Sequence, residues 1–219
     1  MTLDELLAAA TPSVGGLDLR QSRALLRLAL DGDRALERAA VETYEEFVGV
    51  LYKDLNEIFQ RLESARPYYH KASEDAITIA IAHQLKGKYI ANHDADNNGH
   101  CDLVVESRFH PTFKWLGEAK IDRGPAYDWG GWLQLTTRYA NASPGNDHGG
   151  LLLYMRDENA AGRLNDWADH IKGQGIACTF EDKTARGQLA FSVESVDKGS
   201  GVTYRVRHMA VSLFHDPQK

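Results

Sequence analysis

Residues 100–121 have the sequence HCDLVVESRFHPTFKWLGEAKI. A run rich in β-branched, apolar and aromatic residues lies at each end of this segment, and polar residues and a proline separate the two runs, which predicts two strands. Side chains alternate between the faces of a strand, so Glu118 and Lys120 project to the same side of the second run. Asp102 interrupts the otherwise apolar first run. The segment therefore predicts neighbouring strands that bring two carboxylates and one ammonium group together.

The flanking sequence predicts a mixed α/β domain with a central sheet flanked by helices. Ser73 is a suitable N-cap, Gly87 suits the C′ position of the same helix, and Asn98-Gly99 is a strong hairpin turn. The expected elements are a helix over 74–86, strands over 88–93, 100–105 and 113–121, a helix over 127–141, a loop over 143–150, a strand over 151–155, a helix over 158–171, and strands over 176–180, 188–196 and 202–214.

Residues 1–66 are predicted to form a separate helical region, and residues 67–219 the main domain. Gly15-Gly16 separates a short first helix from one over 20–30. The next stretch carries a heptad pattern, which Pro67 ends because the residue before proline avoids helical dihedrals. This pattern fits a helix that packs on its own chain, and it also fits a seam with a second copy or a partner protein through residues 20–66. Its apolar positions are Val41, Tyr44, Val48, Leu51, Leu55, Ile58 and Leu62.

A short motif in this order of elements resembles a known family. Asp102, followed sixteen positions later by Glu118-Ala119-Lys120, resembles the D…E-x-K motif of the PD-(D/E)xK nuclease superfamily, which includes many restriction endonucleases. The order predicted from the first helix resembles the αβββαβ restriction-endonuclease-like core of that superfamily. Glu74 matches the acidic residue that many members carry on the first core helix. The resemblance leaves the N-terminal helices unexplained.

The resemblance implies a metal-dependent nuclease that hydrolyses phosphodiester bonds, with double-stranded DNA as the expected substrate and restriction or anti-phage defence as the expected setting. Asp102, Glu118 and the Ala119 carbonyl would hold Mg²⁺ or Mn²⁺, and Glu74 would bind a second ion or orient a water. Such a hard cation prefers oxygen ligands, lowers the pKa of its bound water and polarises the phosphate. Lys120 would position or help deprotonate the attacking water and would stabilise the developing negative charge.

Residues around the motif are candidates for contacts with the substrate. His100 shares a strand face with Asp102, although a surface histidine is the alternative. Some members carry a glutamine and a tyrosine on the helix after the motif, and here Gln134 and Tyr139 are one residue further apart than in the recombination-exonuclease subgroup. Gln134 also fits a polar surface position. The basic residues near the expected face are Arg123, Lys114, Arg138 and Arg156.

Three other interpretations stay open. A surface ion-pair cluster would explain the acidic residues and the lysine without chemistry, since such pairs are common. A non-catalytic nucleic-acid-binding or assembly subunit could retain the same core. Residues 94–99 match the first half of a calcium-binding loop, but position 12 of that loop is Val105 where a glutamate is needed. A polar hairpin turn accounts for these residues equally simply.

The composition of the chain limits the classes of protein to which it can belong. The chain has 219 residues, a net charge of −6, 43% hydrophobic and 26% charged residues, which is typical of a folded globular protein. A protein that coats nucleic acid by bulk charge is disfavoured, whereas an enzyme with a metal site can be acidic. No apolar run is long enough for a membrane span, and the acidic start predicts no signal peptide and a cytoplasmic location. Cys101 and Cys178 form no disulfide framework, so both are expected to be buried thiols.

Overall fold

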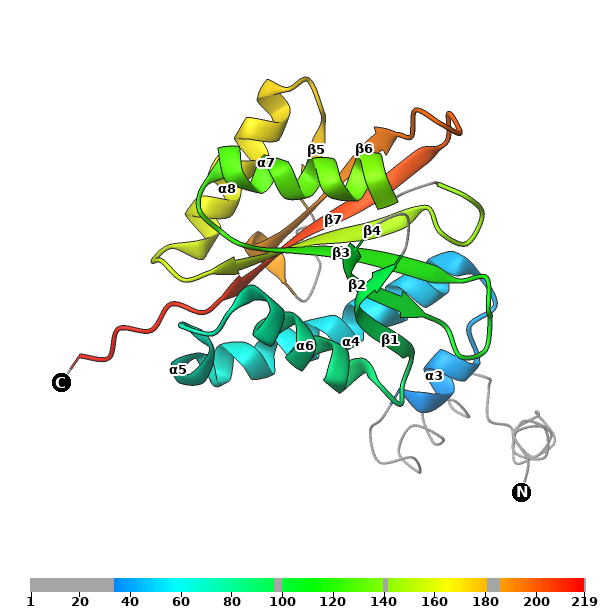
Figure 1. The fold of residues 1–219 in the computed structure, drawn as a ribbon, viewed down its shortest axis with the longest axis horizontal. Coiled ribbons are helices and arrows are strands. Elements are labelled where there is room, and N and C mark those ends of the chain that lie inside the picture. The colour runs from blue at the N-terminus through cyan, green and yellow to red at the C-terminus, as the bar shows by residue number, and fades with distance from the viewer. Residues whose placement is uncertain (1–33, 97–99, 140–141, 181–185, 219) are drawn as a thin grey trace, which may run out of the picture. The chain divides into compact units, whose positions relative to one another are not determined.

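Seven strands form one mixed sheet in the order β1-β2-β3-β4-β7-β6-β5 (Figure 1). The computed structural model describes residues 34–96, 100–139, 142–180 and 186–218. The pairs β3–β4 and β4–β7 are parallel, and the other neighbouring pairs are antiparallel. The mixed α/β class is therefore confirmed. The strands are β1 (Ile90–Asp96), β2 (His100–Glu106), β3 (Lys114–Ile121), β4 (His148–Met155), β5 (Cys178–Phe180), β6 (Ala190–Val196) and β7 (Thr203–Ser212).

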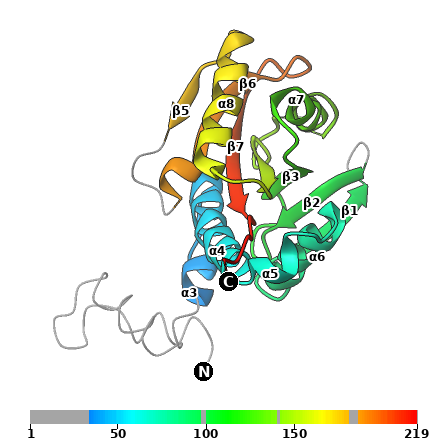
Figure 2. The same cartoon turned by 90° about the vertical axis from the view of Figure 1, so that its left-hand side faces the viewer.

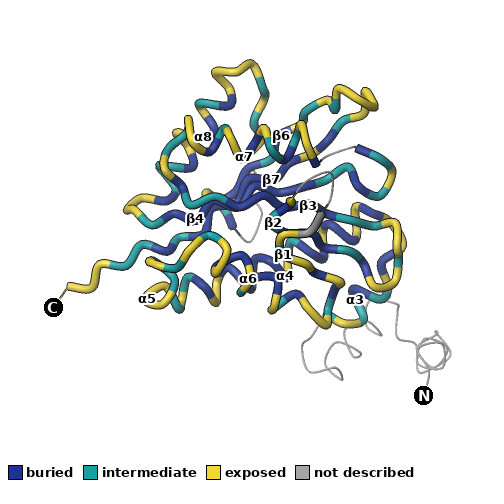
Figure 3. Tube along the Cα trace, viewed as in Figure 1, coloured by how far each residue is buried: buried dark blue, intermediate teal, exposed yellow. Residues whose placement is uncertain are grey.

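Helices cover both faces of this sheet (Figures 1 and 2). On one face, α6 contacts β1, β2 and β3, and α4 contacts β7 and α6; on the other, α7 contacts β3 and β4, and α8 contacts β7. The central strands are consequently buried on both sides (Figure 3), which explains the continuous apolar run in β4. The helices are α4 (Tyr44–Ser64), α5 (Arg66–Tyr69), α6 (Glu74–Leu85), α7 (Pro125–Gln134) and α8 (Ala160–Gly173). None of the described helices combines the length and apolar character needed to cross a bilayer.

The chain divides at residue 43 rather than at residue 66. Tyr44–Lys219 forms one compact unit, and Met1–Thr43 forms another. The predicted boundary between residues 66 and 67 thus falls inside the larger unit, after α4. Within the smaller unit, α3 (Ala35–Ala39) is described, whereas the helices expected before residue 33 lie outside the described residues.

The heptad face of α4 is buried within the chain. Its six positions from Tyr44 to Leu62 are at most 7% exposed. Of the two alternatives, this supports packing on the same chain, and the α4 face is not free to form a seam with a second copy. Helix α4 ends at Ser64, before the proline, but not for the expected reason, because Arg66 is itself helical as the first residue of α5. Pro67 lies in the first turn of α5, a position where its missing N–H costs nothing.

The elements that hold the motif largely match the prediction. Ser73 caps α6, since its hydroxyl accepts a hydrogen bond from Ala76 N at 3.1 Å, and Gly87 after the helix has a φ of +91°. Strands β1 and β2 form the expected antiparallel pair, with Asp96 opposite His100. The turn residues 97–99 lie outside the described part of the chain.

Two segments differ from the prediction. The expected helix over 127–141 begins earlier, at Pro125, and changes after Gln134 into a π-helix, η1 (Leu135–Tyr139). Strand β4 begins at His148, inside the predicted loop, because its two glycines serve close packing rather than a turn. A Cβ at Gly149 would lie 2.3 Å from Tyr204 Oη, and one at Gly150 would lie 2.4 Å from the Trp115 ring. A short 3₁₀-helix, η2 (Gly187–Leu189), precedes β6.

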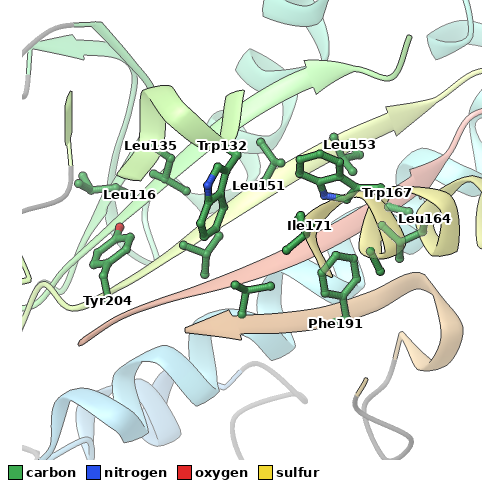
Figure 4. Close-up of a cluster of buried hydrophobic side chains, with 14 of the residues drawn as sticks. Leu116, Trp132, Leu135, Leu151, Leu153, Leu164, Trp167, Ile171, Phe191 and Tyr204 are labelled. Carbon is green, nitrogen blue, oxygen red and sulfur yellow. The ribbon is translucent and has the colours of Figure 1, made fainter. Parts of the chain in front are cut away.

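A hydrophobic core of aliphatic and aromatic side chains fills the space between the sheet and the helices α7 and α8 (Figure 4). His208 of β7 lies in this core and is fully buried. Its ring stacks on Phe191 at a centroid distance of 4.5 Å and on Trp132 at 5.5 Å, and Trp167 Nε1 donates a hydrogen bond to its Nδ1 at 3.0 Å. Burial lowers the pKa of His208 to about 3, so the ring is neutral.

Candidate active site

The candidate site forms where β2 leaves β3. The two strands pair from Glu106–Lys114 as far as Leu103–Gly117, and in the described part of the chain β3 continues beyond that point with no strand on this side. Two carboxylates take the place of the missing strand. Ala119 N donates to Asp102 Oδ2 at 2.8 Å, and Ile121 N donates to Glu74 Oε2 at 2.7 Å. Both main-chain N–H groups are thereby satisfied, which avoids the cost of burying them unpaired.

Three carboxylates surround the ammonium group of Lys120. Its Nζ lies 2.5 Å from Glu118 Oε1, 3.7 Å from Glu74 Oε1 and 3.9 Å from Asp102 Oδ2. The groups come from α6, β2 and β3, so residues far apart in the sequence converge on one point. The structure therefore brings together all four side chains that the sequence analysis singled out. We refer to Glu74, Asp102, Glu118 and Lys120 as the carboxylate–lysine cluster.

Burial shapes the electrostatics of this cluster. The Glu118 side chain is 1% exposed, and burial together with the charge of Asp102 raises its pKa to about 7, although the Lys120 ammonium opposes the shift. Burial acts to lower the pKa of Lys120, but its hydrogen bond with Glu118 and the negative charges of the three carboxylates outweigh burial and raise it. Lys120 is thus an ammonium ion. Glu118 Oε2 is buried and accepts no hydrogen bond from the described residues.

Two contacts that the sequence analysis missed hold the cluster in place. Gly131 of α7 packs on the stem of Lys120, because a Cβ there would lie 2.9 Å from Lys120 Cγ. On the other face, Thr78 Oγ1 donates to the main-chain oxygen of Glu74 at 2.9 Å and lies 2.8 Å from Tyr154 Oη, which ties the first turn of α6 to β4. The position of Thr78 four residues after Glu74 was the one available signal, since residues at that spacing share a helix face.

The four candidate substrate-contact residues differ in burial and in whether they lie near the carboxylate–lysine cluster. His100 is 80% exposed and pairs with Asp94 at 2.9 Å, with no described contact to the cluster. Tyr139 is buried, and burial and the charge of Glu118 raise its pKa, so it lies near the cluster. Gln134 is half-buried, and its side chain makes no hydrogen bond with a described residue. Arg123 is exposed, and its guanidinium lies over the Tyr127 ring at 4.9 Å.

The π-helix η1 bears on the spacing of Gln134 and Tyr139. In a π-helix the hydrogen bonds run between residues five apart, so such residues lie above one another as residues four apart do in an α-helix. The extra residue between Gln134 and Tyr139 is therefore compatible with a shared face. Nothing in the sequence signals a π-helix at this point.

A second acidic group lies at the end of β3. Asp122 accepts hydrogen bonds from Arg163 Nε and from Gly124 N at 2.9 Å, and these contacts outweigh burial and lower its pKa. Asp128 is fully buried beside it. Burial and the neighbouring Asp122 raise the pKa of Asp128 to about 8, so Asp128 holds a proton at neutral pH. Asp122 could have been noticed from the sequence, because it continues the alternation of Glu118 and Lys120.

The carboxylates of the cluster could serve as ligands of a divalent cation, but in this structure the Lys120 ammonium lies among them. Its carboxylate oxygens are of the hard type that Mg²⁺ and Mn²⁺ prefer, and Glu118 Oε2 is a buried acceptor without a donor. Among the described residues, however, no three His, Cys, Asp or Glu side chains are close enough to form a metal-binding group. The three carboxylates instead converge on the ammonium of Lys120.

Both cysteines are free thiols. Cys101, which stands where the motif has a proline, is buried as expected, and burial raises its pKa to about 12. Cys178 is only half-buried, since it lies on the short edge strand β5.

Comparisons of the chain with protein-family models, with curated proteins and with solved structures found no match.

Proposed function

We propose that this chain is a metal-dependent nuclease with a restriction-endonuclease-like core, acting on the phosphodiester bonds of double-stranded DNA. The observation that carries the proposal is the convergence of Glu74, Asp102 and Glu118 within 4 Å of Lys120 Nζ. The element order α6-β1-β2-β3-α7-β4, which follows the αβββαβ pattern of the superfamily, supports it. Restriction or anti-phage defence would be its setting.

In this proposal Asp102 and Glu118 hold one Mg²⁺ or Mn²⁺ ion, with the Ala119 carbonyl as a further ligand, and Glu74 binds a second ion or orients a water. The bound ion would supply a water of lowered pKa and neutralise charge on the phosphate. Asp102 and Glu74 are held by main-chain N–H groups of β3, which orients their carboxylates before any ligand arrives.

In this proposal the role of Lys120 is that of a positively charged group. The surrounding carboxylates raise its pKa, so its Nζ carries a proton and can donate hydrogen bonds to a phosphate oxygen. This favours stabilisation of negative charge in the transition state over removal of a proton from water. The stem of Lys120 is packed against Gly131, which restricts where the ammonium can lie.

The direct test is cleavage of supercoiled plasmid in the presence of Mg²⁺ or Mn²⁺. Lys120→Ala and Glu118→Ala should each reduce cleavage by on the order of 100-fold or more, as removal of a transition-state contact does elsewhere. Lys172→Ala and Asp169→Ala are matched controls, because they remove an exposed ion pair of 2.9 Å on α8. Equal cleavage by all variants, or no cleavage by the wild-type protein with any divalent ion, would refute the proposal.

The same set of proteins separates a nuclease from a binding-only subunit. The nuclease proposal predicts a Mn²⁺ site that calorimetry detects and that Asp102→Ala removes. A protein that binds duplex DNA without cleaving it, and shows no such site, would instead support the non-catalytic alternative.

A further inference from the structure

Two arginines occupy equivalent positions at the carboxyl ends of neighbouring parallel strands. Ile121 of β3 lies opposite Tyr154 of β4, and Asp122 N donates to Tyr154 O at 3.2 Å. Arg123 and Arg156 each follow two residues after this last pair, so both leave the sheet at the same edge. In α/β proteins, ligands bind at the carboxyl ends of parallel strands.

Arg156 is anchored beside the carboxylate–lysine cluster. Its guanidinium donates to Ala72 O, two residues before Glu74, and its Nε is buried without a hydrogen-bond partner among the described residues. The charges of Arg123 and Glu74 both act on Arg156: burial and Arg123 lower its pKa, and Glu74 opposes them. The two guanidinium groups and the cluster are therefore electrostatic neighbours.

The nearby carboxylates do not neutralise these arginines. Asp122 accepts a hydrogen bond from Arg163 Nε, and Asp157 Oδ2 lies 3.4 Å from Arg163 Nη1. The acid next to each arginine in the sequence therefore pairs with α8 instead. Neither Arg123 nor Arg156 forms an ion pair with a described residue. Two like charges held at one edge, neither of them in an ion pair with a described residue, favour an anionic ligand.

We infer that Arg123 and Arg156 form a phosphate-binding pair that seats a backbone phosphate of the nucleic acid beside Glu74 and Lys120. The inference rests on the proposed nuclease function. A guanidinium can donate two parallel hydrogen bonds to phosphate, and stacking of Arg123 on Tyr127 pre-orients its donors. The pair would fix the register of the strand relative to the cluster without reading its sequence.

The test is binding of a short fluorescent duplex in EDTA, where cleavage does not occur, measured by anisotropy over a range of salt concentrations. Arg123→Ala and Arg156→Ala should each weaken binding by roughly tenfold and reduce the salt slope by about one, irrespective of the sequence of the duplex. Arg156→Lys should recover part of the affinity. Arg205→Ala is the matched control, because it removes an exposed arginine that pairs with Glu194 at the far end of β7.

Unchanged duplex affinity and salt slope in the double variant would overturn the inference, as would a wild-type protein that does not bind the duplex. Competition by inorganic phosphate identifies the source of the ligand. If phosphate binds in an arginine-dependent way while duplex affinity is unaffected by the substitutions, the pair serves a free anion and the inference is wrong. Plasmid cleavage by the same proteins keeps the two proposals apart, because a wild-type protein that binds through the pair but never cleaves refutes only the nuclease.

Discussion

Replacement of His208 by phenylalanine should make the stability of the protein less sensitive to acid. The native pKa of His208 is lowered to about 3 by burial, whereas a histidine in an unfolded chain titrates near 6.5. Because the folded state cannot readily accept the proton, acid favours the unfolded state, and the stability present above pH 6.5 is lost as the pH falls toward 3. Each pH unit in this window costs about 1.4 kcal/mol, so the loss between neutral pH and pH 5 is about 2 kcal/mol.

Phenylalanine keeps an aromatic ring between Phe191 and Trp132 but does not titrate. The variant should be less stable at neutral pH by about 1–3 kcal/mol, because Trp167 Nε1 loses its acceptor. Urea unfolding followed by tryptophan fluorescence at neutral pH and at pH 5 gives the free energy of unfolding of both proteins. The difference between them should shrink by about 2 kcal/mol at the lower pH.

Other groups that titrate in this range, including Glu118 and Asp128, contribute to both proteins and cancel in that difference. His83→Gln, which removes the imidazole of an exposed histidine of α6, is the matched control variant. Parallel pH profiles for the wild type and His208→Phe would refute the reasoning, since His208 would then titrate normally or take its proton without leaving the core.

Three further predictions concern the cluster. Asp102→Ala should lower the free energy of unfolding by about 1–3 kcal/mol, because the Ala119 N–H loses its acceptor, and an unchanged urea midpoint would contradict this. Gly131→Ala should reduce plasmid cleavage with a comparatively small change in the melting temperature, because its Cβ would lie 2.9 Å from Lys120 Cγ. A Cβ at Gly130 meets open space, so Gly130→Ala should alter neither cleavage nor the melting temperature. Similar effects of the two substitutions would argue against this reasoning. Lys120→Met should abolish cleavage yet tighten Mn²⁺ binding in calorimetry by roughly tenfold, because the ammonium no longer competes for the carboxylates. Weaker binding would be the opposite of this expectation.

Local rules predicted much of the structure around the motif. Alternation along β3 placed Glu118 and Lys120 on one face, the cap at Ser73 located the start of α6, and helix phase brought Glu74 to the site. These features depend on a few neighbouring residues, so the sequence carries them directly.

Features set by distant contacts could not be predicted in this way. The heptad on α4 is the same whether its partner is a second copy or the chain's own sheet. The glycines at 149 and 150 resemble loop residues until Tyr204 and Trp115 are known to pack on them. The contact between Gly131 and Lys120 depends on how closely α7 approaches the sheet, and the insertion of β7 between β4 and β6 depends on long-range pairing.

The hydrogen bonds from β3 to Asp102 and Glu74 have a consequence for how this protein would evolve. If the proposed nuclease activity were lost, a descendant would still need these two acids to complete the edge of its sheet. The side chains of Glu118 and Lys120 do not pair with the described main chain at the edge of the sheet, and a buried ion pair can be exchanged for apolar residues at little loss of stability. Among relatives, the positions of Glu118 and Lys120 should therefore separate active from inactive lineages, whereas retention of Asp102 and Glu74 alone would only indicate an intact fold.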